Sequence, residues 1–287
     1  MGLRKDCIIL LLLVLMLIMA GCAGERKSEE KQEQKEVPPA IKEIEGVLLS
    51  IMQQADLIPA TEKLSGQSQT NSGSKEGNQE KGKPVKELTY EDTLLGELLK
   101  AEGFEVEEQK LPQSTDIIWD GINKSIARLY SQWNDLEPLL KESESVSQAE
   151  IAQFEEGLDN LTVFSSEQNY FATMTAANQL TGNLANLMAS FADNKVIPLY
   201  KLKFHLRSIV LQAATDDYSG AQESLDYIKG QKPVLTQSLD ENELRALELS
   251  LEDLQRVLDK QNLELVILNA SIVMGNTARV IEKSSFS

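Results

Sequence analysis

Apolar residues recur every three or four positions along most of the chain. The clearest stretch contains an unbroken series of them: Trp119, Ile122, Ile126, Leu129, Trp133, Leu136 and Leu140. A single apolar seam of this kind predicts a helix that packs against other helices. Nothing between residues 115 and 283 has the alternating apolar and polar positions of a half-buried strand. The pattern therefore predicts an all-α fold, a multi-helix bundle of long antiparallel helices.

Capping signals mark where two of the long helices begin. Ser147 and Glu150 have the spacing of a capping box, in which the serine and the glutamate each bind a backbone amide of the other residue. The helical pattern that follows runs to about Asp193. Asp240 and Glu243 begin the last long pattern, in which leucines keep heptad spacing. We expect this last pattern to break at residues 260–262.

Composition divides the rest of the mature chain into helices and linkers. Residues 22–39 are charged and rich in glutamine, which predicts a flexible tether. Residues 40–58 have the pattern of an amphipathic helix, and residues 59–87, which are rich in Gly, Ser, Gln, Asn and Lys, predict a disordered linker. A short helix and a loop are expected over residues 88–114. The helical bundle domain is expected over residues 115–283.

The N-terminus has the pattern of a secretory signal. Arg4 and Lys5 precede a continuously apolar run over residues 8–19. A run of this length behind a basic start is typical of a secretory signal rather than of a stable membrane-spanning helix. The run ends in Met19-Ala20-Gly21-Cys22, where small residues stand directly before a cysteine. Residues 1–21 are therefore predicted to be a signal peptide that is removed.

The Met19-Ala20-Gly21-Cys22 ending resembles the lipobox of bacterial prolipoproteins, although Met19 stands where that box usually has leucine. The resemblance implies that Cys22 accepts a diacylglycerol and becomes the first residue of the mature chain. It also implies a protein held by lipid on the extracytoplasmic face of the cell membrane. The whole chain resembles lipoproteins of Gram-positive bacteria that pair a lipobox with an α-helical body, and no activity carries over from them.

A second, partial resemblance concerns the way in which the helices pair. Ala221, Leu225, Ile228 and Pro233 have the spacing of the second helix of a tetratricopeptide repeat, but the preceding helix lacks that repeat's aromatic and glycine positions. The likeness covers about half of one repeat and implies no functional residues. It leaves a short solenoid of helical hairpins as the alternative architecture.

Charge and cysteine content exclude several classes of partner. The formal net charge is −17 at pH 7. Nucleic-acid binders need clustered cations for phosphates, so we expect no nucleic-acid partner. Anionic lipid headgroups would also repel this body, so contact with the membrane is expected through the lipid on Cys22 alone. Cys7 leaves with the signal peptide, so no disulfide and no cysteine metal site is expected.

The most unusual composition lies in residues 168–192, which are 25 residues without a charge. A helix that avoids charge on every face is usually surrounded by other helices, and its amides must then find hydrogen-bond partners inside the bundle. Two interpretations stay open. The residues form a satisfied polar seam in a central helix, or they line a pocket for a small ligand. The candidate ligand-binding residues are Asn169, Asn178, Gln179 and Asn183.

Catalytic motifs are missing from the sequence. There is no phosphate-binding glycine loop, nucleophile elbow or zinc-binding His-Glu-x-x-His pattern, and His205 is the single histidine. We therefore predict no enzymatic activity, no cofactor and no metal site. The leading hypothesis is a non-catalytic interaction or accessory protein of the cell envelope with a protein partner. The alternative hypothesis is a small-ligand-binding helical bundle with a pocket lined by Asn, Gln and Thr.

Overall fold

The structure, a computed structural model, describes residues 37–70, 93–105, 112, 114–143, 146–189, 191 and 197–285. Every regular element in these ranges is an α-helix, and none is a strand, so the prediction of an all-α helical bundle is confirmed. The helices are α2 (Pro39–Asp56), α3 (Ile58–Thr70), α4 (Gly96–Ala101), α5 (Thr115–Lys141), α6 (Gln148–Ser166), α7 (Tyr170–Met188), α8 (Ile197–Ala214), α9 (Tyr218–Gly230), α10 (Lys232–Ser238), α11 (Glu241–Leu258) and α12 (Leu263–Ser285). The signal sequence, Cys22, residues 22–36 of the predicted tether and residues 71–87 of the predicted linker lie outside the described residues. Residues 59–70, which were also expected to belong to that disordered linker, are instead helical and form most of α3.

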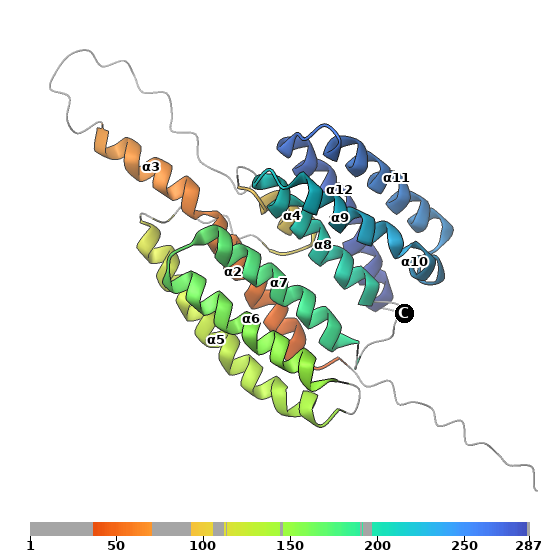
Figure 1. Ribbon diagram of the computed structural model, residues 1–287, viewed down its shortest axis with the longest axis horizontal. Coiled ribbons are helices and arrows are strands. Elements are labelled where there is room, and N and C mark those ends of the chain that lie inside the picture. Colours follow the sequence, from red (N-terminus) through yellow and green to blue (C-terminus); the bar gives the residue numbers. More distant parts are fainter. Residues whose placement is uncertain are drawn as a thin grey trace, which may run out of the picture. The chain divides into compact units, whose positions relative to one another are not determined.

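Four helices from the first two thirds of the chain form a closed group. Each of α2, α5, α6 and α7 packs against two of the others, in the order α2, α5, α6, α7 and back to α2 (Figure 1). The apolar seam of α5 faces this group, since Trp119, Ile126 and Trp133 are all buried. The ring of Trp133 stacks on that of Phe154 from α6, with centroids 4.3 Å apart. We call this set the N-terminal group.

The remaining long helices close a second group. Here α8 packs on α9, α9 on α11, α11 on α12, and α12 returns to α8. The contact between α12 and α8 closes the group around its own core, whereas the hairpins of a solenoid would stack in an open row. The short helix α10 lies between α9 and α11 in sequence and touches both. We call this set the C-terminal group.

The two groups belong to one compact unit, residues 36–287, and several helix–helix contacts join them. Helix α7 packs on α8, and α4 packs on both α12 and α2. This unit begins well before residue 115, where the sequence pattern suggested that the bundle starts. The amphipathic pattern of α2 is buried against α5 and α7, with Ile44, Leu48 and Ile51 fully covered. Sequence spacing revealed the apolar face of α2 but not the helices that cover it.

Left-handed residues end three helices of the two groups. Gln168, Asp216 and Gln261 have φ values of 55°, 61° and 50°, and each is followed directly by an Asn or Asp that caps the next helix. Asn169, for example, accepts a hydrogen bond from the amide of Ala172 at 3.1 Å. A left-handed residue followed by a side-chain cap stops one helix and starts the next within a few residues.

This turn chemistry corrects one prediction from the sequence. The helical pattern from Ser147 to about Asp193 was expected to be continuous, but it forms two helices, α6 and α7. Their reversal occurs at Gln168, where no glycine or proline signals a turn. The expected capping box at Ser147 is present, because the amide of Glu150 donates to Ser147 Oγ at 3.2 Å. The expected break near Gln261 is present as well.

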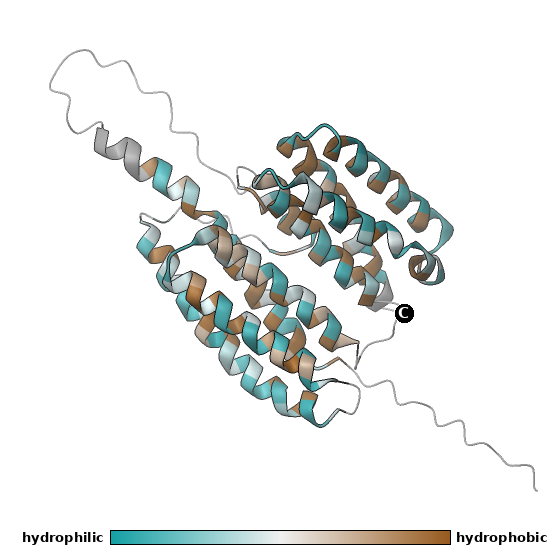
Figure 2. Cartoon of the chain, in the orientation of Figure 1, coloured by the Kyte–Doolittle hydropathy of each residue, from teal (hydrophilic) through white to brown (hydrophobic). Residues whose placement is uncertain are grey.

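Helix α12 combines core and surface roles. Residues 263–283 are long and apolar enough to cross a membrane by length and composition, and this is the one helix of the described residues that meets that test. Val266, Ala270, Val273 and Met274 of this helix are nevertheless fully buried in the core of the protein. Figure 2 shows its partner α11 as a mixture of hydrophilic and hydrophobic residues along its length. Helices of this kind pack one face and expose the other.

The left-handed turns make a testable prediction about stability. Gln261→Gly should raise the free energy of unfolding by about 0.5–1 kcal/mol, because glycine removes the steric cost of a left-handed side chain but adds freedom to the unfolded chain. Gln153→Gly is the matched control, since Gln153 lies inside α6 and is exposed. That change should lower the free energy by about 1 kcal/mol. Urea unfolding measures the free energy of unfolding of both variants. An equal decrease in both would show that the left-handed conformation of Gln261 has no steric cost.

Candidate functional site

The uncharged stretch forms the central helix of the N-terminal group and its bridge to the C-terminal group. Helix α7 packs against α2, α6 and α8, so three of its sides are covered. This arrangement agrees with the expectation that a helix without charges is surrounded by others. Two glycines allow the close packing. A Cβ atom at Gly157 would lie 2.7 Å from Leu180, and one at Gly182 would lie 3.0 Å from the ring of Phe204.

Asn178, one of the four predicted ligand-binding residues, is buried against α8. Its amide nitrogen donates to Ser208 Oγ at 2.9 Å and to the carbonyl of Phe204 at 3.3 Å. Its amide oxygen accepts from Arg207 Nε at 2.8 Å. These partners use the hydrogen-bonding groups of the amide, so Asn178 belongs to the packing between α7 and α8.

Asn183 lies on a different side of α7, toward α6. Its amide nitrogen donates to the backbone carbonyl of Gln153 at 3.4 Å, and its oxygen accepts from Gln179 at 3.4 Å. Asn183 is buried, whereas Gln179 is exposed. The four predicted residues therefore do not converge on one cavity.

Two of the four residues do share a groove. Asn169 and Gln179 line a depression of about 490 Å³ between α6 and α7. Its other polar lining residues are Asn160 and Thr175, and the remainder are Phe164, Phe171, Gly157, Ala172 and Ala176. No charged side chain lines it, although the protein as a whole is strongly acidic. We call it the uncharged groove.

A second cluster of polar side chains lies in the interior, where α2, α4 and α8 meet. Lys203 and Arg207 extend from α8, and each pairs with a carboxylate from a distant part of the chain. Lys203 Nζ lies 2.7 Å from Glu45 of α2 and 2.8 Å from Glu102, which directly follows α4. Arg207 Nη1 lies 2.5 Å from Glu102. We call Glu45, Glu102, Lys203 and Arg207 the buried ion cluster.

Burial makes the electrostatics of this cluster strong. The side chains of Arg207 and Glu102 are only 1% and 2% exposed. Burial by itself would raise the pKa of Glu102, but the charges of Arg207 and Lys203 outweigh it and hold that pKa below the ordinary value. For Lys203, burial acts to lower the pKa, and Glu102 and Glu45 raise it above the ordinary value instead. The cluster thus joins two acidic and two basic side chains, whose formal charges balance.

The neutral partners of Arg207 extend this network into α7. Its Nη2 donates to Thr181 Oγ1 at 2.8 Å, and its Nε binds Asn178. Asn178, one of the amides that the sequence suggested as a ligand group, therefore binds an arginine of the protein itself. Reasoning from the sequence missed this cluster, because Glu102 lies in residues 88–114, for which the pattern predicts only a short helix and a loop. The available signal was a pair of cations, Lys203 and Arg207, four residues apart in a helix with apolar residues on two sides.

A third acid holds the other end of α4. The backbone amides of Leu94 and Leu95 donate to the carboxylate of Asp56 at 3.0 and 2.6 Å. Asp56 is buried, and burial raises its pKa to about 6, although hydrogen bonds from Leu95, Thr93 and Leu94 oppose the shift. One carboxylate therefore fixes each end of the short helix α4. Asp56 binds the residues before the helix, and Glu102 follows its last residue.

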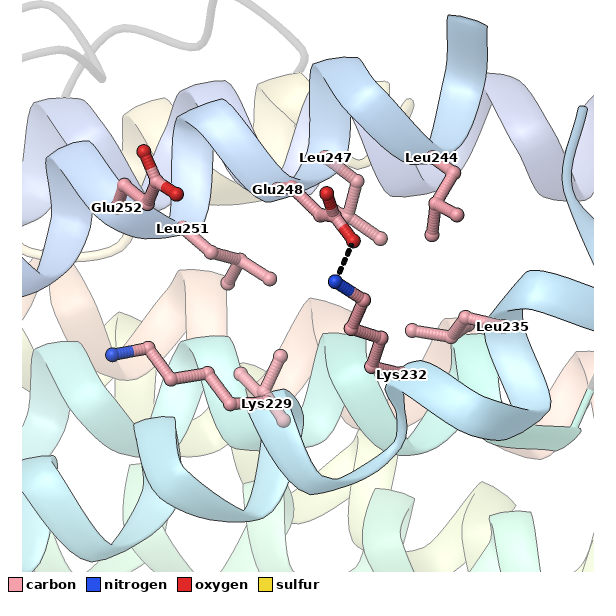
Figure 3. Close-up of a pocket in the computed structure, with 9 residues that line it drawn as sticks. Lys229, Lys232, Leu235, Leu244, Leu247, Glu248, Leu251 and Glu252 are labelled. Atoms are coloured by element: carbon pink, nitrogen blue, oxygen red, sulfur yellow. Dashed lines mark ion pairs between the residues drawn. The ribbon is translucent and has the colours of Figure 1, made fainter. Parts of the chain in front are cut away.

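A groove of about 300 Å³ opens in the C-terminal group, between α9 and α10 on one side and α11 on the other. Its floor is aliphatic, built from Leu244, Leu247 and Leu251 of α11 with Ile228 and Leu235 opposite. Figure 3 shows these leucines pointing into the space between the helices, with the ion pair of Lys232 and Glu248 across it at 2.7 Å. Lys229 and Glu252 complete the lining. We call it the aliphatic groove.

His205, the single histidine of the chain, lines neither groove. His205 stacks on Tyr227 with ring centroids 4.0 Å apart, and burial, with the charge of Lys201, lowers its pKa to about 4. Within the described ranges, no three His, Cys, Asp or Glu side chains gather as a metal site would require. Searches with this chain against family models, curated protein sequences and solved structures find no match. Among the described residues, the uncharged groove and the aliphatic groove are two sites whose geometry could accept a binding partner.

The buried ion cluster predicts a large loss of stability when one charge is removed. Glu102→Gln should lower the free energy of unfolding by about 3–5 kcal/mol, because it leaves two buried cations with one acid. Replacing both partners, as in Glu102→Leu with Arg207→Leu, should cost less than the sum of the two single changes. Glu137→Gln is the control, since its pair with Lys141 is at the surface and should contribute under about 1 kcal/mol. A double-mutant cycle by urea unfolding measures these terms, and additive single losses would contradict the coupling.

Asp56 predicts a pH dependence with a definite sign. Its pKa is about 6 in the folded protein against an ordinary 3.8, so between these values the folded state binds more protons than the unfolded state. The stability that this carboxyl contributes is thus fully present below about pH 4 and is lost as the pH rises through 6. From pH 4 to pH 7 the free energy of unfolding of the wild type, relative to Asp56→Asn, should fall by about 3 kcal/mol. Parallel unfolding profiles for the two proteins would refute this.

Proposed function

We propose that this protein is a lipid-anchored, extracytoplasmic helical protein that acts without catalysis by binding a protein partner of the cell envelope. The observation that carries the proposal is the aliphatic groove, which combines a floor of leucines with charged rims. Grooves of this kind bind the apolar side chains of another polypeptide, while the rim charges select among partners. The uncharged groove has neither an aliphatic floor nor a charged rim.

The N-terminal sequence supports the proposed location. A basic start, an apolar run and the sequence Met19-Ala20-Gly21-Cys22 are the signals that direct lipidation and export. A diacylglycerol on Cys22 would hold the acidic body near the membrane without requiring its surface to bind anionic lipid. The segment between Cys22 and α2 then sets how far the aliphatic groove reaches from the bilayer.

The uncharged groove supports a second candidate function, binding of a small neutral ligand. Asn169 and Gln179 lie there with Asn160 and Thr175, and Phe164 and Phe171 provide apolar surface beside these polar groups. A few polar groups on an apolar wall are typical of small-molecule sites. Without a charged lining residue, such a ligand would be recognised through hydrogen bonds and shape.

Lipidation at Cys22 is tested by a single substitution. Cys22→Ser should abolish incorporation of a labelled fatty acid and leave an unprocessed precursor, because the thiol is the atom that would be acylated. Gel mobility and metabolic labelling in the native host measure both effects. Undiminished labelling of the variant would exclude Cys22 as the acceptor.

Partner binding is tested by photo-crosslinking in intact cells. A photoreactive amino acid at Lys232 should give an adduct with an envelope protein, and the same probe at Arg128, exposed on α5, should not. Adding Leu244→Asp should remove the adduct, because a charge enters the apolar floor. Adducts of equal yield from both positions would count against the aliphatic groove.

The second candidate gives a different result. A neutral ligand at the uncharged groove should raise the free energy of unfolding by roughly 2.7 kcal/mol at a hundredfold excess over its dissociation constant. Gln179→Leu should cancel that gain, whereas Leu244→Asp should leave it unchanged. A thermal-shift screen with neutral envelope metabolites and peptides measures it.

A further inference from the structure

The apolar stripe of α11 runs from the core into the floor of the aliphatic groove. Leu254 and Leu258, in the C-terminal half of α11, are buried in the core. Leu247 and Leu251, in the floor of the groove, are also nearly covered, with 3% and 7% of their surface exposed. Leu244 at the far end of the stripe is half-buried, so the stripe reaches solvent there.

The size of the groove limits what can enter it. Its volume of about 300 Å³ corresponds to roughly ten water molecules in the liquid. That is room for a few aliphatic side chains but not for the backbone of a helix. An occupant must therefore lie along the mouth and insert side chains from one face, as an amphipathic helix does in a hydrophobic groove.

The ion pair between Lys232 and Glu248 crosses the mouth of the groove, and breaking it should cost little free energy. Lys232 and Glu248 are 62% and 36% exposed, and pairs at such exposure contribute about 0–1 kcal/mol. An incoming helix that supplies a carboxylate to Lys232 and a cation to Glu248 replaces that pair with two new ones. Opening the groove then loses no charge pairing.

The rim charges are separated by sign. Lys229 and Lys232 lie on the side of α9 and α10, and Glu248 and Glu252 lie on α11 (Figure 3). Lys229 Nζ binds the neutral amide oxygen of Gln255 at 2.5 Å, and among the described residues neither Lys229 nor Glu252 has an ion-pair partner. One rim therefore offers a cation and the other an anion for pairing with an occupant.

Resting on the proposed function, we infer that the aliphatic groove binds an amphipathic helix of the partner protein, whose apolar face is flanked by acidic residues on one side and basic residues on the other. The aliphatic side chains enter the groove between Leu235 and Leu247. The acidic flank lies over Lys229 and Lys232, and the basic flank lies over Glu248 and Glu252.

The test uses three synthetic helical peptides that share one leucine face. The first has glutamates on one flank and lysines on the other, the second has glutamates on both, and the third has lysines on both. Fluorescence anisotropy measures their binding to the full-length protein in detergent, and empty micelles provide the blank. The glutamate peptide places one flank against Glu248 and Glu252, and the lysine peptide places one flank against Lys229 and Lys232, so each is repelled by one rim. The mixed peptide should therefore bind about fivefold or more tightly than either like-charged peptide.

Charge reversal makes the expected ranking specific to the groove. With Lys229→Glu and Lys232→Glu both rims become acidic, so the lysine peptide should bind best. With Glu248→Lys and Glu252→Lys the glutamate peptide should bind best. Lys124→Glu with Arg128→Glu on α5 changes the net charge as Lys229→Glu with Lys232→Glu does, so it is the matched control for that variant, and it should keep the original ranking. These positions are at the surface, so the variants should fold, and circular dichroism checks this.

The outcomes separate this inference from the proposed function. An unchanged ranking in the two charge-reversed proteins, or no binding of any peptide, overturns the mixed-flank helix as the occupant. If the cellular adduct at Lys232 is still lost with Leu244→Asp, the groove binds a partner of another chemistry and the proposed function stands. If the full-length protein instead forms a dimer that Lys232→Glu dissociates, a second copy of this chain occupies the groove and the inference fails.

Discussion

The buried ion cluster is the interaction on which the arrangement of the helices depends. Lys203 and Arg207 come from one helix of the C-terminal group, and their carboxylate partners come from α2 and from the residue after α4. Placing four charges in the interior is costly unless each finds a partner, so the cluster allows only the packing in which all of them meet. It thereby couples α8 to Glu102 and Glu45, which lie 105 and 158 residues away in the sequence.

Helix α4 shows how a short element becomes part of such a core. Six residues cannot hold a helix by themselves, because nucleation is costly and few backbone hydrogen bonds form. Leu95, Leu98 and Leu99 bury their side chains, while Asp56 and Glu102 fix the two ends. The two carboxylates are opposite in character. Glu102 is stabilised in its charged form by cations, whereas the burial of Asp56 opposes its charge.

The two grooves of the protein differ in the side chains that line them. The uncharged groove presents amides and phenylalanines on helices α6 and α7, and the aliphatic groove presents leucines between rims of opposite charge in the C-terminal group. The neutral lining follows from the composition of α7, whose charge-free sequence suits three covered sides and leaves a neutral fourth side. The acidic rim follows from α11, whose apolar stripe is flanked by an acidic outer face, and the basic rim comes from Lys229 of α9 and Lys232 of α10.

The sequence by itself determined the helical class, the apolar faces, the starts of α6 and α11 and the break before α12, because three- and four-residue spacing and capping boxes depend on neighbours along the chain. It also indicated that α7 lies inside the bundle. The tertiary structure alone decided that α2 belongs to the core, that Glu102 meets Arg207, and that Asn178 turns toward α8 while Asn169 and Gln179 share a groove. Those outcomes depend on which faces meet across long stretches of chain, and helical periodicity states that a face is buried without stating what buries it.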